Sequence, residues 1–367
     1  KDAKQNSLKE IKQIEPEIPG KDVALTIDSR LQYLLYKELE KAGRLQKARW
    51  STGMIVDVQT GEVLALSTWP SCNSNNLNEM TGENQRNRAL LDVFEPGSVM
   101  KPFTVAAALD SGKYTTTSLI DTNPGSIRVR GYTIRDHNNL GRITLGTLLQ
   151  KSSNVASTKI ALSLPPDAIT NMQKQFGFGS KTPLQFPGEG SGLVVTPKEK
   201  ETSRRATVSY GYGLQVTLAQ VAQAYSALAA GGVMHPLTLT KDGERPPSKR
   251  IMAHEQAMSI VQMMESVTEP GGTAKGAAID GYRVAGKTGT SRRINPKGGY
   301  YTDQYRNVFA GMAPASNPKL VGVILIEDPR GQIYAGLTVA PVFHNVMKEA
   351  LRLYNVPLDK PLKTEEQ

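Results

Sequence analysis

Two pairs of residues in the sequence combine a serine hydroxyl with a lysine three positions further along. They are Ser98 with Lys101 and Ser316 with Lys319. On a helix this spacing places both side chains on one face, where the lysine amine can take the proton of an attacking hydroxyl. Each pair is therefore a candidate nucleophile with its base.

The local sequence favours the first pair. Pro102 lacks an N–H, which a helix tolerates only in its first turn, so we expect a helix to begin near Ser98. Free N–H groups and the dipole at a helix N-terminus stabilise developing negative charge, and the N–H of Ser98 is a natural oxyanion donor. In the second pair, Pro318 denies Ser316 a helix. We therefore predict Ser98 as the nucleophile and Lys101 as its base.

A further lysine lies in the segment 281–288, which matches the phosphate-loop pattern G-x-x-x-x-G-K-[ST]. A phosphate loop follows a buried strand and opens a helix. Here residues 282–285 favour an extended backbone, and residues 290–299 are predicted to form a loop without helical period. We interpret the match as accidental and do not predict nucleotide binding.

The same lysine suits a carboxylate ligand. Lys287 is expected near the end of a strand, with Thr288 and Thr290 alternating onto one face across Gly289. A glycine at that position lets a ligand approach the backbone. One cation and two hydroxyl donors, side by side, predict a carboxylate-binding site.

A third pattern, S-x-N, occurs at Ser152 and Asn154 within the otherwise helical stretch 144–164. It predicts a hydroxyl and an amide on a tight bend between two helices, whereas the other S-x-N triplets lie in an Asn-rich loop at 71–87. S-x-x-K, an S-x-N element and K-T-G belong together in serine enzymes that react with penicillins. Their order along this chain, each in a fitting local structure, is a strong signal.

With these motifs the chain resembles the transpeptidase domain of a class B penicillin-binding protein. The resemblance covers roughly residues 20–357 and extends to the septal (cell-division) type of Gram-negative bacteria, the penicillin-binding protein 3 type. The segments that carry this narrower resemblance are Thr26-Ile-Asp-Ser-Arg-Leu-Gln32, Arg86-Asn-Arg88, Phe94-Glu-Pro-Gly-Ser98, Lys151-Ser-Ser-Asn-Val155, Tyr210-Gly-Tyr-Gly213 and Ala313-Pro-Ala-Ser316.

The resemblance implies an α/β (α+β) fold of the penicillin-binding transpeptidase and serine β-lactamase type. In this fold a five-stranded antiparallel sheet is flanked by helices, and an all-helical subdomain is present. The residues themselves predict a compatible order of elements. We expect a strand at 23–27, a helix, a hairpin around Gln59-Thr60-Gly61, several helices, strands at 283–288, 307–312 and 320–327, and a last helix at 341–353.

The expected division of the chain follows from the same resemblance. Residues 1–20 are interpreted as the linker remnant of a removed N-terminal anchor and pedestal region, and 21–357 as the transpeptidase domain. The helical subdomain is expected as an insert at roughly 113–270, and 358–367 as a polar tail. The resemblance places such a domain in the periplasm, anchored in the inner membrane through an N-terminal segment absent from this chain.

The activity that the resemblance implies is that of a D,D-transpeptidase acting on peptidoglycan stem peptides that end in D-Ala-D-Ala. Ser98 would attack the penultimate carbonyl with Lys101 as base, and Ser152 would relay the proton to the departing amine. β-Lactam antibiotics would acylate the same serine. The residues assigned to substrate binding are Asn154, Lys287, Thr288, Gly289, Thr290, Tyr212 and Tyr334. No cofactor is implied; the implied partners are a septal glycosyltransferase and other membrane proteins of the divisome.

The motifs alone leave two alternatives open. A serine β-lactamase shares all three motifs but needs a base that activates water, and the sequence shows no E-x-x-L-N element. A non-enzymatic β-lactam sensor would be acylated without turnover. The septal signatures favour the transpeptidase.

Composition argues against other functions. The 367 residues carry a formal net charge of +10, but the basic residues are scattered without a long run, so we do not predict nucleic-acid binding. Cys72 is the only cysteine, which excludes an intramolecular disulfide and a cysteine metal site. His137, His235, His254 and His344 lie far apart in the sequence, and no metal site is predicted.

Overall fold

The computed structural model describes residue 6 and residues 18–362. Most of the linker expected at 1–20 lies outside the described residues, as does the second half of the tail expected at 358–367. The expected domain boundaries stay predictions.

A five-stranded antiparallel sheet forms the centre of the molecule, in the order β2-β1-β11-β10-β9. Its strands are β1 (Trp50–Asp57), β2 (Val63–Trp69), β9 (Ala285–Ile294), β10 (Tyr300–Ala313) and β11 (Leu320–Glu327). Every residue of β11 is buried, because this apolar strand has neighbours on both edges and helices on both faces. β1 and β2 form the hairpin predicted from the turn residues between them. The sheet confirms the predicted fold class.

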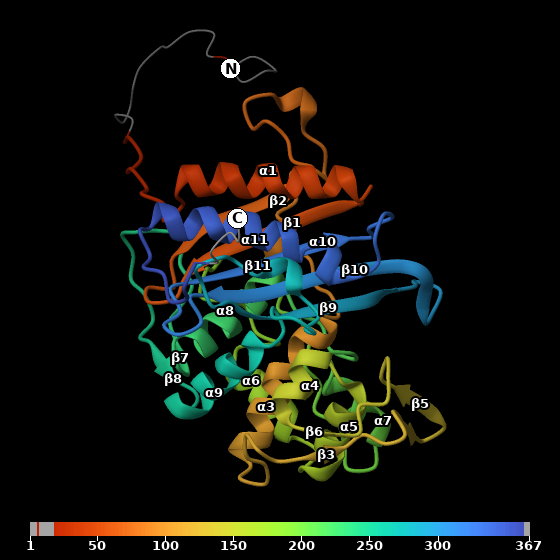
Figure 1. Ribbon diagram of the computed structural model, residues 1–367. Helices are drawn as coiled ribbons and strands as arrows, with labels where there is room; N and C mark the ends of the chain where they lie inside the picture. Colours follow the sequence, from red (N-terminus) through yellow and green to blue (C-terminus); the bar gives the residue numbers. More distant parts are fainter. Residues whose placement is uncertain (1–5, 7–17, 363–367) are drawn as a thin grey trace, which may run out of the picture.

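Two helices cover one face of the sheet (Figure 1). α1 (Ser29–Leu45) and α11 (Ala340–Leu353) lie in contact with each other there. α1 begins after Asp28, the predicted N-cap, whose side chain accepts a hydrogen bond from the N–H of Arg30. Its buried residues recur at helical spacing and form the stripe that packs on the sheet. They include Leu31, Leu35 and Leu39.

A third helix, α8 (Leu218–Ala229), covers the opposite face and contacts β1, β10 and β11. All of its residues are buried, and α9 (His254–Glu265) packs against it. α8 opens with the predicted capping box. Thr217 Oγ1 accepts from the N–H of Gln220, and the side chain of Gln220 accepts from the N–H of Thr217.

The remaining elements include a lobe formed by α3 to α7, which lies below the sheet in Figure 1. Within the span expected as a helical insert, α8 packs on the sheet, while the short pairs β3–β6 and β4–β5 accompany the lobe. The bounds of these elements are η1 (Leu77–Glu79), α2 (Arg88–Leu91), η2 (Gly97–Met100), α3 (Lys101–Asp110), β3 (Ile120–Asp121), β4 (Ser126–Val129), β5 (Tyr132–Arg135), β6 (Arg142–Ile143), α4 (Leu145–Lys151), α5 (Asn154–Ser163), α6 (Ala168–Gln175), α7 (Thr202–Val208), β7 (Val233–Met234), β8 (Lys249–Arg250), η3 (Lys275–Ala277) and α10 (Ala335–Thr338).

Two predicted elements differ from the structure. The strand expected at 23–27 is wrong, since Leu25 forms only an isolated bridge with Thr240. The loop expected at 290–299 is also wrong in its first part, because β9 continues to Ile294, which pairs with Tyr300 of β10. The local sequence does not reveal this extension, because these residues form a strand only by pairing with β10.

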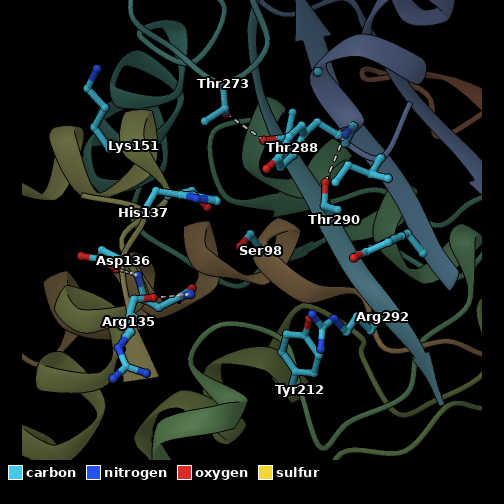
Figure 2. A pocket seen from close by; sticks show the side chains of 17 residues that line it. Ser98, Arg135, Asp136, His137, Lys151, Tyr212, Thr273, Thr288, Thr290 and Arg292 are labelled. Atoms are coloured by element: carbon cyan, nitrogen blue, oxygen red, sulfur yellow. Dashed lines mark hydrogen bonds between the residues drawn. The ribbon is translucent and has the colours of Figure 1, made fainter. Parts of the chain in front are cut away.

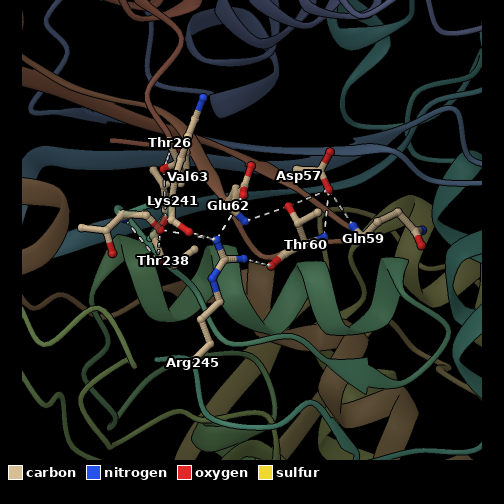
Figure 3. A network of polar contacts seen from close by, with 10 residues as sticks. Thr26, Asp57, Gln59, Thr60, Glu62, Val63, Thr238, Lys241 and Arg245 are labelled. Carbon is tan, nitrogen blue, oxygen red and sulfur yellow. Dashed lines mark hydrogen bonds and ion pairs between the residues drawn. The ribbon is translucent and has the colours of Figure 1, made fainter. Parts of the chain in front are cut away.

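A polar network ties the β1–β2 turn to the segment that follows α8 (Figure 3). Thr26 Oγ1 lies 2.6 Å from the carbonyl oxygen of Val63 and 3.2 Å from that of Thr238. Arg245 forms an ion pair with Glu62 at 3.2 Å and also donates to backbone carbonyls on both sides of the junction. These contacts hold the outer edge of the sheet to the 238–245 segment.

Candidate active site

A cavity of about 750 Å³ opens between β9 and the lobe formed by α3 to α7. Residues from all three sequence motifs line it, together with both predicted tyrosines. Figure 2 shows Ser98 between β9 on one side and the segment 135–137 on the other. The predicted residues that line the cavity are Ser98, Ser152, Asn154, Tyr212, Thr288, Thr290 and Tyr334.

Ser98 lies in the 3₁₀ turn η2, and the α-helix proper begins at Lys101. The expectation that a helix begins near Ser98 is therefore correct only to within one turn. The N–H of Lys101 donates to the carbonyl of Ser98, so the two residues are still joined across that turn. Pro102 falls in the first turn of α3, where its missing N–H costs no helical hydrogen bond.

Lys101 is fully buried and its amine reaches the bend that follows α4. Nζ lies 2.6 Å from the carbonyl oxygen of Ser152, 3.0 Å from Ser152 Oγ and 2.7 Å from Asn154 Oδ1. Burial and then the charge of Lys287 lower the pKa of Lys101 well below its ordinary value, while the carboxylate of Asp136 opposes the shift. The buried amine is thus disposed to be neutral.

Lys287 is also fully buried, and it approaches Ser152 from β9. Its Nζ lies 3.1 Å from Ser152 Oγ and 3.1 Å from the carbonyl oxygen of Thr288. Burial lowers the pKa of Lys287 to about 7. Ser152 Oγ therefore lies between two amines that come from different elements.

The predicted bend at the S-x-N motif is confirmed. α4 ends at Lys151 and α5 begins at Asn154. Ser152 has a left-handed backbone conformation with φ of 58°, which turns the chain between the helices. Ser153 caps α5 by accepting a hydrogen bond from the N–H of Ala156.

The K-T-G residues lie on β9 beside the Ser98 turn. Thr288 Oγ1 is 2.8 Å from Thr273 Oγ1, and Thr290 Oγ1 accepts a hydrogen bond of 3.1 Å from the N–H of Ala335. A Cβ on Gly289 would lie 2.8 Å from the carbonyl oxygen of Pro96. In the structure, Gly289 therefore allows the Ser98 turn to lie close to β9.

The two predicted tyrosines both line the cavity. Tyr212 packs edge-on against Tyr210 and Tyr300, with ring centroids 5.8 and 5.7 Å away, and burial raises the pKa of its phenol. Tyr334 is half exposed and faces the ring of His137, 6.3 Å away.

Several residues that line the cavity were not predicted from the sequence. Lys151 and Arg292 adjoin the S-x-N and K-T-G motifs, so a wider window around each motif would have found them. Asp136 and Thr273 lie in segments without periodic pattern and reach the site only through the fold. These residues include Arg135, Asp136, His137, Lys151, Thr273 and Arg292.

A comparison of the sequence with known protein families gives a result that agrees with the fold and with the three motifs that meet at the cavity. Residues 51–348 match the family described as the penicillin binding protein transpeptidase domain. The chain therefore belongs to the penicillin-binding protein transpeptidase family.

Two relatives of this chain are named as peptidoglycan D,D-transpeptidases. Peptidoglycan D,D-transpeptidase FtsI of Escherichia coli K12 is 42% identical over 339 residues, which are 92% of this chain and 57% of that protein. Probable peptidoglycan D,D-transpeptidase PenA of Neisseria flavescens is 37% identical over 94% of this chain and 85% of its own length. The chain spans little more than half of the Escherichia coli relative.

The fold is also similar to that of a solved structure from the same family. The transpeptidase domain of penicillin-binding protein 3 from Burkholderia pseudomallei, in its apo form, superposes with a TM-score of 0.84 at 39% identity. The superposition covers 94% of this chain and all of that one. The expected resemblance to the penicillin-binding protein 3 type is confirmed.

Proposed function

We propose that this chain is a D,D-transpeptidase domain that cross-links peptidoglycan stem peptides during septal cell-wall synthesis and is the covalent target of β-lactams. The observation that carries the proposal is the position of Ser152 Oγ between the buried amines of Lys101 and Lys287, at 3.0 and 3.1 Å, in a cavity that Ser98 also lines. A hydroxyl held between two lysines is suited to moving protons.

In the first step Ser98 Oγ attacks the carbonyl between the two terminal D-alanines, and Lys101 takes the hydroxyl proton. A neutral lysine amine has two hydrogens, which match the backbone carbonyl oxygen of Ser152 and the side-chain amide oxygen of Asn154 at 2.6 and 2.7 Å. Its lone pair is then left to accept from a hydroxyl, that of Ser152 at 3.0 Å or that of Ser98 during the attack. The N–H groups of Ser98 and Thr290 stabilise the oxyanion.

The tetrahedral intermediate collapses when its C–N bond breaks and the departing D-Ala amine gains a proton. Ser152 donates that proton and is reprotonated by Lys101, so the base is restored as the acyl-enzyme forms. The amine of a second stem peptide then attacks the ester carbonyl. This attack forms the cross-link and frees Ser98.

Binding of the donor stem uses the other predicted residues. Thr288 and Thr290 donate their hydroxyls to the terminal carboxylate, and Lys287 adds positive charge beneath them. Thr290 retains its own hydrogen for this purpose because it accepts from Ala335. The amide of Asn154 binds the stem backbone. Tyr212 and Tyr334 border the side groups of the substrate.

The native setting is proposed from the relatives. We infer a periplasmic domain, anchored in the inner membrane through a segment outside this chain, which works with a septal glycosyltransferase and other divisome proteins. Among the described residues, no helix combines the length and apolar character that a membrane span requires.

The test is labelling with a fluorescent penicillin followed by peptide mapping. We expect label on Ser98 alone, no label on Ser98→Ala, and full labelling of the matched control Ser316→Ala, whose hydroxyl donates to Asp359 at 2.6 Å. Label on Ser316, or label that survives in Ser98→Ala, would contradict the proposal.

A further inference from the structure

One carboxylate outside the three motifs holds the segment that carries Ser152. Asp136 accepts hydrogen bonds from Ser153 Oγ at 2.6 Å, from the N–H of Asn154 at 2.6 Å and from the N–H of Val155 at 3.0 Å. All three donors belong to the first turn of α5 or to its cap. The carboxylate therefore satisfies N–H groups that have no partner within the helix and lies at the positive end of the helix dipole.

Asp136 is itself fixed by the β4–β5 hairpin. It directly follows β5, and its N–H donates to the carbonyl of Gly125 at 3.0 Å. The preceding residue, Arg135, accepts a hydrogen bond at 3.3 Å from the side-chain amide of Asn154. Two consecutive residues at the end of the hairpin thus hold both the backbone and the side chain of Asn154. In Figure 2 these two residues, Arg135 and Asp136, lie across the cavity from β9.

We propose that Asp136 is a positioning residue that fixes Ser152 and Asn154 against Lys101 and whose negative charge acts on the Lys101 amine. This inference rests on the proposed function, since it concerns the proton transfers of acylation. Ser152 adopts a left-handed conformation that is uncommon for a residue with a side chain, so an external anchor on the next three residues keeps it there.

The charge of Asp136 has a separate effect. The charged groups that act on the Lys101 amine are Lys287 from β9, which disfavours its protonation, and Asp136 from the end of β5, which favours it. The atoms of the α4–α5 bend that contact the Lys101 amine are uncharged oxygens. Removal of the Asp136 charge therefore lowers the pH at which Lys101 gains its proton.

Two substitutions distinguish the hydrogen bonds that Asp136 accepts from α5 from the effect of its negative charge. Asp136→Asn keeps a carbonyl oxygen for the N–H groups of α5 but loses the charge, whereas Asp136→Ala loses both. The matched control is Asp121→Asn, an exposed carboxylate whose side chain contacts Asn123 in the β3 turn. The second-order rate of acylation by a fluorescent penicillin is measured from pH 5 to pH 9, with thermal unfolding of each variant in parallel.

We expect the acidic limb of the Asp136→Asn profile to move to lower pH. We expect Asp136→Ala to lose about 100-fold in rate at every pH, the order of loss that follows a small misplacement of catalytic groups. Asp121→Asn should follow the wild type. An Asp136→Asn limb that coincides with the wild-type limb, or an Asp136→Ala rate equal to wild type, would overturn the inference. A wild-type chain without label on Ser98 would instead contradict the proposed function.

Discussion

Lys101 and Lys287 both reach the same oxygen atom, Ser152 Oγ, at distances of 3.0 and 3.1 Å. Both amines are fully buried, and two buried positive charges this close would repel each other with little screening. The cluster is therefore stable only if at least one amine is neutral. Burial and then the charge of Lys287 lower the pKa of Lys101 well below its ordinary value, which supports the proposed role of Lys101 as the base.

The two lysines should differ in their effect on acylation. Lys101→Ala removes the base and should reduce the second-order rate with benzylpenicillin by about 10²–10⁴-fold. Lys287→Ala removes a charged hydrogen bond of about 1.5–3 kcal/mol and should cost less. Stopped-flow acylation rates of both variants, with thermal unfolding as a control for folding, check this order. A larger loss in Lys287→Ala would reverse the two roles.

The buried amine of Lys287 should also make stability depend on pH. Its pKa in the folded chain is about 7, below the ordinary 10.5, so the unfolded chain binds more protons between these values. Stability contributed by this group therefore rises as pH increases from about 7 toward 10 and is lost as pH falls. Lys287→Met removes this term. Between pH 7.5 and pH 9, the free energy of unfolding in urea should increase more for the wild type than for the variant. Equal increases in the two proteins would show that Lys287 titrates normally.

Thr273 should act through Thr288, because their hydroxyl oxygens are 2.8 Å apart. Thr273→Val removes a hydrogen bond of about 1 kcal/mol and should slow acylation roughly 5-fold to 10-fold by leaving the Thr288 hydroxyl free to rotate. Thr273→Ser keeps the hydroxyl and should restore most of the rate. If the serine variant were as slow as the valine variant, a hydroxyl at position 273 would not be sufficient to support acylation, and the proposed role of the Thr273 hydroxyl would be contradicted.

A substitution away from the cavity should change stability alone. Thr26→Val deletes the buried hydroxyl that donates to Val63 and Thr238 (Figure 3) and should lower the free energy of unfolding by about 1–3 kcal/mol. Thr60→Val is the control, since that hydroxyl is exposed in the adjacent turn. Acylation of both variants should match the wild type. A slower Thr26→Val would mean that the sheet edge is coupled to Ser98.

Much of the site could be predicted because each motif has a local signature. Pro102 fixes the first turn of α3 one turn after Ser98, and Ser152 interrupts a helical pattern at the bend that the structure shows. Asp136 could not be predicted in the same way. It meets Asn154 across 18 positions, through a hairpin whose register depends on pairing between β4 and β5.

The strands show the same division between local and long-range information. β11 was predicted over its full length because an unbroken apolar run needs no partner to be recognised. The second half of β9 was missed because its polar residues become a strand only by pairing with β10. The full burial of Lys287 likewise depends on what packs over β9, which the alternation of residues along one strand does not contain.

In the proposed function, Ser98 forms an acyl-enzyme that reacts with an amine acceptor and not with water. Hydrolysis of the ester requires a base beside a bound water. The sequence has no E-x-x-L-N element to supply that base, and the leaving group of an opened β-lactam stays tethered in the site. The most direct measurement traps the chain with benzylpenicillin, removes free drug and follows the intact mass over time, with Ser98→Ala as control. We predict one adduct, on Ser98, that persists for hours. Loss of the adduct within seconds, with hydrolysed penicillin accumulating over many turnovers, would make the chain a β-lactamase and contradict the account.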